Sequence, residues 1–247
     1  MRRVVALLFV ATAACGLIGS TAGYAGTFCG TLDAATVFCD SFDTDASPWG
    51  SVDSGSQNPI TLSIENGPKT SLASPPNVLH VIADGGAARA NRLRHPFLST
   101  DFPSGTAICG FDFEVLSVPN QPALIVWLEE ETQNNGTPLY GGGASVSPNG
   151  DVSAGACMFQ GDAGPQCLGN GGHKLDTGEW HHVEMTVMRT PDAGITSVQV
   201  QLDATTELVP FAVNTSIAPG NLALCVGLAT EDVGVTGDVL LDNVFCR

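Results

Sequence analysis

Two pairs of carboxylate side chains are spaced in a way that could support acid–base chemistry on sugars. Asp112 and Glu114 form one pair, and Glu129 and Glu131 form the other. Within each pair the residues are two positions apart, so alternation along a strand would place both on one face. Retaining hydrolysis of a glycosidic bond needs two carboxyl groups about 5 Å apart. A third carboxylate at a suitable offset is missing from each pair, so the favoured interpretation is a solvated polar face of a strand.

Positive charge is concentrated in one short segment, residues 89–95. It contains Arg89, Arg92 and Arg94 in a chain with 9 basic and 25 acidic residues. Guanidinium groups bind carboxylates with two parallel hydrogen bonds. This segment could therefore bind an acidic sugar or pair with neighbouring acids, and the second role is the favoured interpretation.

Aromatic side chains that could stack on a sugar ring are few. Trp127 lies in an apolar run beside Glu129 and Glu131, so it could line a concave face, and Tyr140 follows in the next polar stretch. The candidate ligand-binding residues are Trp127, Tyr140, Arg92 and Arg94. Core packing remains the favoured role for any one tryptophan taken alone.

The cysteines indicate disulfides. The chain has no C-x-x-C pair, which disfavours a zinc site, and seven of its 8 cysteines follow residue 25. Cys157 and Cys167 flank a short Gly-rich loop and are expected to pair, whereas Cys109 and Cys225 lie in strand-like runs and could join neighbouring strands. The remaining three compete for one bond: Cys29, Cys39 and Cys246.

The first 25 residues have the pattern of a secretory signal peptide. Arg2 and Arg3 precede an apolar run, and Gly23-Tyr24-Ala25 offers a small-x-small cleavage site. The alternative is a lipoprotein, acylated at Cys15 after cleavage. We expect a secreted, extracellular or cell-surface protein with no transmembrane span after residue 25.

The charge and the pattern of short apolar runs limit the class of protein. A net charge of −16 disfavours nucleic acid and anionic membranes as partners. Short alternating runs recur between clusters of Gly, Pro, Asn and Asp, which is typical of strands and turns. In 107–115, Cys109, Phe111 and Phe113 should face the core and Asp112 should face out.

Other segments strengthen this all-β pattern. Residues 122–129 are continuously apolar, as in a strand covered on both faces, and Pro148-Asn149-Gly150 predicts a hairpin turn. We interpret 141–143, three glycines, as a flexible turn. The pattern predicts one all-β domain, a two-sheet antiparallel jelly-roll sandwich spanning 36–247, after an N-terminal extension at 26–35.

Three segments resemble the concanavalin A-like lectin/glucanase superfamily, which includes laminin-G-like domains. The first is 38–43 with Trp49 after it; the second is Gly178-Glu179-Trp180-His181-His182-Val183; the third is 239–245. The resemblance implies a jelly roll in which the final strand pairs beside the first. It also implies that calcium could bind where these strands meet, at Asp40, Asp43 and Asp242.

The same resemblance does not decide between enzyme and binding module. Glucanases of the superfamily carry E-x-D-x-x-E on one strand, and this chain has no such motif. Alginate lyases carry an Arg-rich strand, which 89–95 resembles, but their Gln-x-His strand is absent. We therefore expect a secreted, non-catalytic, lectin-like module that requires no cofactor and binds a polysaccharide or a cell-surface glycan. The alternatives are a divergent glycoside hydrolase or polysaccharide lyase, and a structural adhesion protein.

Overall fold

The computed structural model describes most of the chain after residue 27. The described residues are 28–32, 34–43, 49, 51–53, 60–67, 77–86, 90–98, 100–131, 138–159, 165–190, 194–203, 206–207, 211–212, 221–230 and 233–247. The predicted signal peptide and Cys15 lie outside this part of the chain. Among the described residues, no helix has the length and apolar character needed to cross a membrane.

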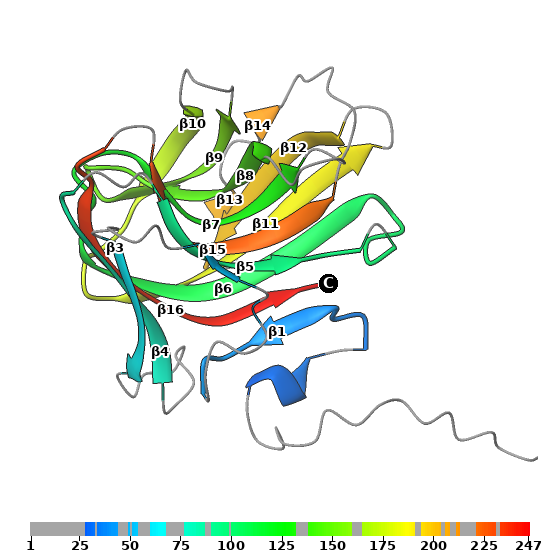
Figure 1. The fold of residues 1–247 in the computed structure, drawn as a ribbon, viewed down its shortest axis with the longest axis horizontal. Coiled ribbons are helices and arrows are strands. Elements are labelled where there is room, and N and C mark those ends of the chain that lie inside the picture. Colours follow the sequence, from blue (N-terminus) through cyan, green and yellow to red (C-terminus); the bar gives the residue numbers. More distant parts are fainter. Residues whose placement is uncertain are drawn as a thin grey trace, which may run out of the picture.

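The strands form two sheets that pack face to face (Figure 1). Sheet A contains, in spatial order, β13 (Thr206–Glu207), β12 (Gly194–Leu202), β11 (Trp180–Thr190), β6 (Thr106–Ser117), β16 (Thr236–Cys246), β4 (Asn77–Asp84) and β3 (Ile60–Asn66). Two short strands also join it: β1 (Phe38–Asp40) beside β16 and β14 (Phe211–Ala212) beside β12.

Sheet B is the second layer of the sandwich. It contains, in spatial order, β10 (Pro165–Lys174), β9 (Asp151–Phe159), β8 (Pro138–Val146), β7 (Ala123–Glu131), β15 (Leu222–Thr230), β5 (Ala90–Pro96) and β2 (Ser51–Asp53). The strand pairs of both sheets are antiparallel. The structure confirms the predicted all-β, two-sheet jelly-roll sandwich.

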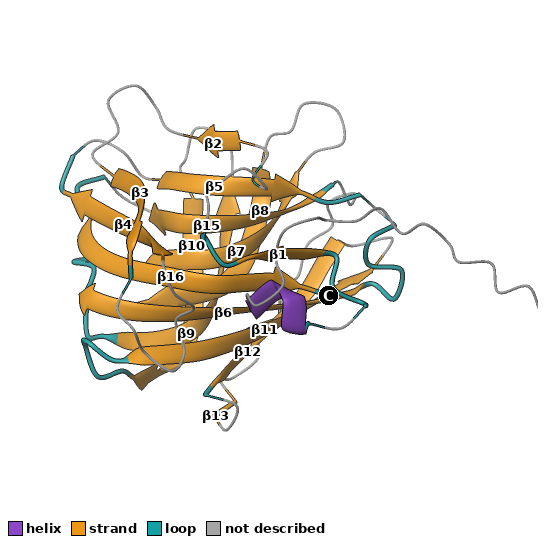
Figure 2. Ribbon diagram, turned by 90° about the horizontal axis from the view of Figure 1, so that it is seen from below, coloured by secondary structure: helices purple, strands orange, loops and turns teal. Residues whose placement is uncertain are grey.

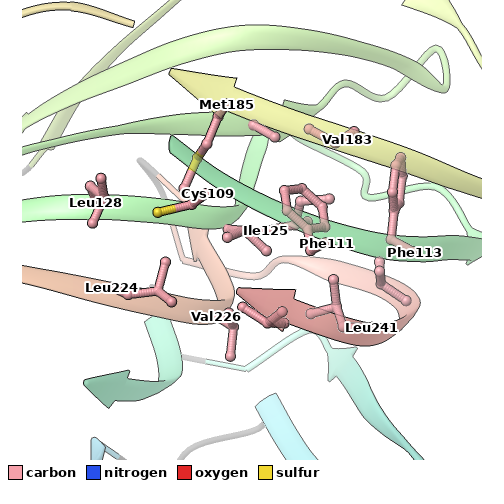
Figure 3. Close-up of a cluster of buried hydrophobic side chains, with 14 of the residues drawn as sticks. Cys109, Phe111, Phe113, Ile125, Leu128, Val183, Met185, Leu224, Val226 and Leu241 are labelled. Carbon is pink, nitrogen blue, oxygen red and sulfur yellow. The ribbon is translucent and has the colours of Figure 1, made fainter. Parts of the chain in front are cut away.

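The hydrophobic core lies between the two sheets (Figure 3). On β6, Cys109, Phe111 and Phe113 point into it and have no exposed area, as the alternation in that segment predicts. Leu128 of β7 and Leu224 of β15 face them from sheet B. Residues 123–130 of β7 are all buried, which confirms a strand covered on both faces.

The two ends of the folded chain meet at β1 and β16. Phe38 lies opposite Cys246 in the antiparallel register, so the final strand pairs beside the first as expected. The short 3-10 helix η1 (Phe28–Thr31) lies close to β1 and the C-terminus (Figure 2). Its Phe28 ring packs against Phe245 at 5.9 Å between centroids.

The disulfides correct part of the cysteine prediction. Cys109 bonds to Cys246 on the neighbouring strand β16, and Cys29 bonds to Cys39. The expected link between Cys109 and Cys225 is wrong, because Cys225 belongs to β15 of the opposite sheet and is not disulfide-bonded. The predicted pair of Cys157 and Cys167 occupies directly opposite positions of β9 and β10. The side chains of both residues lie outside the described part of the chain.

Two turn predictions have different outcomes. Gly150 adopts a φ of 78° between β8 and β9, which confirms the predicted hairpin. The glycines at 141–143 do not form a turn, because they lie inside β8 and pair with both β7 and β9.

Candidate functional site

The candidate site is the face of sheet B that points away from the core. Two separate groups of buried apolar side chains reveal this face: Leu128 and Leu224 belong to the main core, whereas Trp127 and Cys225 form a cluster of their own. Because side chains alternate along a strand, the residues next to core positions point to the outer side. This outer face contains Arg92 and several of the residues singled out from the sequence.

Strand register brings these residues together. Cys225 of β15 lies opposite Arg94 of β5 on one side and Trp127 of β7 on the other. Gly227 of β15 lies opposite Arg92. Residues from β5 and β7, far apart in sequence, are therefore separated by only one strand, and Gly227 lets the β5 backbone approach closely, because a Cβ atom there would lie 2.1 Å from the Asn91 carbonyl oxygen.

Glu129 is the centre of a buried polar cluster on this face. Its Oε2 atom accepts a hydrogen bond from the Arg92 guanidinium, and the same contact is an ion pair. The indole N–H of Trp127 donates to the same oxygen at 3.3 Å, and the Cys225 Sγ lies 3.7 Å from it. Glu129 has no exposed area and Arg92 is 9% exposed, so the charges compensate each other away from bulk water.

Trp127 differs from what its sequence context suggested. It has no exposed area, so its ring offers no stacking face to a sugar in this conformation. The Arg92 guanidinium carbon lies 6.0 Å from the ring centroid. Gly141 provides the space for the indole, because a Cβ atom there would lie 2.6 Å from Trp127 Cδ1. Trp127 thus lies beneath the surface of this face and supports the residues around it.

Cys225 also belongs to this cluster, although the sequence suggests a disulfide for it. Burial raises the pKa of its thiol well above the ordinary value; the charge of Glu129 adds to this rise, and Arg92 and Arg94 oppose it. The thiol therefore stays protonated and serves as a donor toward Glu129. The sequence carried no signal for this role, since only the strand register reveals which residues flank Cys225.

The two predicted carboxylate pairs lie on different sheets. Glu129 belongs to the outer face of sheet B, whereas Asp112 and Glu114 belong to the outer face of sheet A. The side chains of Glu131 and Tyr140 lie outside the described part of the chain, although both residues belong to strands of sheet B. The structure therefore does not unite the four acids into one constellation.

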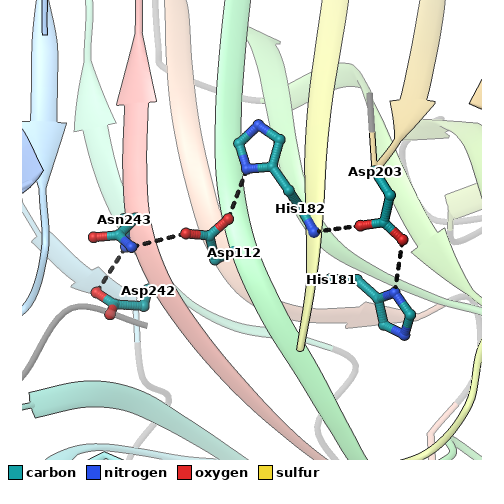
Figure 4. Close-up of polar contacts among 6 residues, drawn as sticks. All are labelled: Asp112, His181, His182, Asp203, Asp242 and Asn243. Atoms are coloured by element: carbon teal, nitrogen blue, oxygen red, sulfur yellow. Dashed lines mark hydrogen bonds and ion pairs between the residues drawn. The ribbon is translucent and has the colours of Figure 1, made fainter. Parts of the chain in front are cut away.

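Asp112 is held by partners on both neighbouring strands (Figure 4). Its Oδ1 atom lies 2.6 Å from His182 Nδ1 on β11, and its Oδ2 atom accepts a 2.7 Å bond from Asn243 Nδ2 on β16. Asn243 has a φ of 52°, the left-handed conformation that asparagine tolerates better than most residues. Asp112 is 4% exposed, so it is a buried, paired acid and not the solvated residue expected from alternation.

Glu114 lies next to Asp112 on the same face. It is 8% exposed and stands opposite Trp180 in the register of β6 and β11. Burial raises the pKa of the Glu114 carboxyl, and the Trp180 indole opposes this rise. A carboxyl with this property suits a proton donor, but Asp112, its neighbour, is occupied by His182 and Asn243.

The residues predicted to bind calcium have other partners. The Asp40 carboxylate accepts bonds from the Phe42 backbone N–H at 2.9 Å and from the Trp49 indole at 2.6 Å. Asp43 accepts a 2.8 Å bond from the Ser41 hydroxyl. Asp242 accepts a bond from the Asn243 backbone N–H at 2.7 Å. Within the described residues, no group of three His, Cys, Asp or Glu side chains is arranged to hold a metal ion.

Comparison with known proteins gives structural neighbours only. No protein-family model and no curated protein matches the sequence. A GH16 protein of Bacteroides ovatus, solved with the product G4G4G3G, has a TM-score of 0.53 at 10% identity over 85% of this chain and 99% of its own. A carbohydrate esterase from bacteriophage phi24B has a TM-score of 0.51 at 12% identity, covering 85% of this chain and 98% of its own. The chain has a concanavalin A-like fold.

A sialidase of Trypanosoma rangeli extends this comparison. It has a TM-score of 0.51 at 14% identity over 87% of this chain, but the match covers only 31% of the sialidase, so the chain spans about a third of that protein. At these identities the similarity establishes the concanavalin A-like fold and no activity.

Proposed function

We propose that this protein is a non-catalytic, lectin-like module that binds a carbohydrate on the outer face of sheet B. The fold supports the ligand class, because it resembles proteins named as a GH16 enzyme, a carbohydrate esterase and a sialidase. The two disulfides support export, because such bonds persist in oxidising compartments. The expected partner is a polysaccharide or a cell-surface glycan.

The cluster around Glu129 is the observation that carries this proposal. An ion pair between Arg92 and Glu129 on the outer side of a sheet costs desolvation energy that an apolar pair would not. It fixes the guanidinium and the Trp127 indole in one arrangement, which suits a site whose polar groups are oriented before the ligand arrives. Arg94 lies on the same face and is partly exposed, so we assign it the direct ligand contact.

The state of the carboxylates favours binding over catalysis. Retaining hydrolysis needs two carboxyl groups about 5 Å apart, one of them ionised and able to attack. The Glu129 carboxylate is buried and held in an ion pair with Arg92, and Asp112 is held by His182 and Asn243, so neither is placed to attack a substrate. A hydrolase or lyase acting through Asp112, Glu114, Glu129 or Glu131 is the alternative that the experiment must separate.

A glycan array with the protein lacking the predicted signal peptide tests the proposal. Arg94→Gln should weaken binding about 10-fold or more, because a charge-assisted hydrogen bond contributes about 1.5–3 kcal/mol. Arg247→Gln is the matched control, since it removes one positive charge from the far sheet, where Arg247 contacts Glu184 at 3.1 Å. Binding without new reducing or unsaturated ends supports the lectin-like role. Cleavage would favour the enzyme, and no binding to any glycan would favour the structural protein.

The same array with and without calcium tests the metal that the resemblance implies. Calcium at Asp40, Asp43 and Asp242 stays a prediction. A bound ion stabilises the folded state by mass action, so a chelator should lower the melting temperature if calcium is present in the protein. An unchanged melting temperature would contradict a structural calcium site.

A further inference from the structure

Three of the five histidines of the chain lie in sheet A and contact carboxylates from neighbouring strands or turns. His80 of β4 reaches two acids: its Nδ1 lies 2.8 Å from Glu65 Oε1 on β3, and its Nε2 lies 2.6 Å from Asp238 Oδ1 on β16. One imidazole thereby connects three adjacent strands. Nε2 forms a hydrogen bond with Asp238 and Nδ1 forms an ion pair with Glu65, so two carboxylates flank the ring and favour its protonated, positively charged form.

His182 of β11 makes a second connection of this kind (Figure 4). Its Nδ1 lies 2.6 Å from Asp112 Oδ1 on β6, and Asn243 of β16 fixes the other oxygen of that carboxylate. Its backbone N–H also donates to Asp203, which follows β12, at 2.9 Å. His181 contacts the second oxygen of Asp203 through Nδ1 at 3.0 Å.

The groups around both rings favour the protonated form. The charged groups around His182 are Asp112 on β6, Asp203 after β12 and Glu184 on its own strand, and Glu184 is bonded to Arg247. The hydrogen bond to Asp112 raises the pKa of His182 despite burial. Burial lowers the pKa of His80, but the contacts with Glu65 and Asp238 outweigh it and the pKa is raised overall.

We infer that sheet A carries a pH-sensitive clamp, in which protonated His80 and His182 join strands β3, β4, β16, β6 and β11 through three carboxylates, of which Asp112 is buried, Asp238 is partly exposed and Glu65 is exposed. The clamp is closed in mildly acidic surroundings and is released as the pH rises. Among the described strands β3 pairs with β4 alone, so the contact of His80 with Glu65 lies at the edge of sheet A.

The direction follows from proton linkage. A histidine whose pKa is raised in the folded state contributes stability that is fully present below the pKa of the unfolded chain, about 6.5. That contribution is lost as the pH rises through the pKa of the folded state, because the folded protein then gives up a proton that the unfolded chain had already released. The clamp therefore opens as the pH rises through the raised pKa values of the two histidines in the folded protein.

Unfolding by urea from pH 5.5 to 8.5 tests the clamp with His80→Gln, His182→Gln and the double variant. The high net charge also makes stability depend on pH, so a matched control is needed. His173→Gln serves this purpose, because His173 is exposed on β10 of sheet B. Wild type and control should lose stability with increasing pH by the same amount, each single variant should lose less, and the double variant least of all.

Two outcomes would overturn the inference. If the double variant is less stable than wild type by the same amount at every pH, the histidines are merely structural, and if its stability equals that of wild type at every pH, they form no clamp. NMR titration of the wild-type imidazoles keeps the test independent of whether the variants fold. The resonances of His80 and His182 must titrate above the value of about 6.5 found for an unperturbed histidine, whereas midpoints at or below it would contradict the clamp.

Discussion

Arg92 on β5 and Glu129 on β7 form an ion pair across the intervening strand β15, with both side chains at least nine-tenths buried. Removing one partner of such a pair leaves an uncompensated buried charge. Arg92→Met should therefore lower the free energy of unfolding by about 3–5 kcal/mol, whereas Arg92→Met with Glu129→Met should recover most of that loss. Urea denaturation of the two variants measures the difference.

The exposed pair of Arg247 and Glu184 provides the control for this measurement. Its nitrogen and oxygen atoms are 3.1 Å apart, but both side chains are substantially exposed. Arg247→Met should cost no more than about 1 kcal/mol, because solvent screens the interaction. Equal costs for the single and double variants at Arg92 and Glu129 would show that the buried charges are not coupled.

The two disulfides should differ in what their removal costs. Cys109–Cys246 has a sequence separation of 137, whereas Cys29–Cys39 has a separation of 10. Constraint of the unfolded chain grows with loop length, which predicts losses of about 5 and about 3 kcal/mol, respectively, when both cysteines of a bond become alanine. Denaturant unfolding of the two double variants should preserve this order. A larger loss for Cys29–Cys39 would mean that contacts of η1 outweigh the loop effect.

The thiol of Cys225 should not react in the folded protein. It has no exposed area, and its pKa is raised well above the ordinary value, so the reactive thiolate is scarce. A thiol reagent at pH 8 should label wild type and Cys225→Ser equally when folded. After denaturation, wild type should gain one more label than the variant. If folded wild type is labelled rapidly and folded Cys225→Ser is not, the outer face of sheet B opens readily enough to expose the Cys225 thiol.

Glu114 provides a second pH dependence of stability. It arises from the cost of ionising a buried carboxyl and not from a favourable protonated histidine. Burial raises the pKa of its carboxyl in the folded state, so ionisation there is disfavoured. The resulting penalty is absent below the pKa of the unfolded chain and is fully present above that of the folded state. Glu114→Gln should therefore become more stable relative to wild type between pH 4 and pH 7, as measured by thermal unfolding. The control is Glu179→Gln, because Glu179 is exposed. A stability difference between Glu114→Gln and wild type that does not change with pH, or that changes no more than the difference for Glu179→Gln, would argue against this effect.

The fold was predictable because it depends on local pattern. Alternation in 107–115 indicated which side of β6 faces the core, and the Pro148-Asn149-Gly150 turn located the hairpin between β8 and β9. The pairing of β1 with β16 followed from the resemblance of the two chain ends to one fold.

The candidate site was predictable only as a set of residue types. Nothing local shows that Arg92, Trp127 and Glu129 meet across β15, because strand register is set by the whole sheet. The same reason explains why the sequence suggests Cys225 and not Cys246 as the partner of Cys109. The three glycines at 141–143 read as a turn in the sequence, which does not reveal that Gly141 and Gly143 lie against Trp127.

The most direct test of glycan binding on sheet B uses the three tryptophan indole N–H signals of the protein. Trp49, Trp127 and Trp180 can be assigned from single Trp→Phe variants, and a glycan selected on the array is then titrated into the labelled protein. The Trp127 signal should shift, because its N–H donates to Glu129 beside Arg92 and Arg94, and the Trp49 and Trp180 signals should stay in place. A shift of Trp180 with Trp127 unchanged would place the ligand on sheet A and contradict the account.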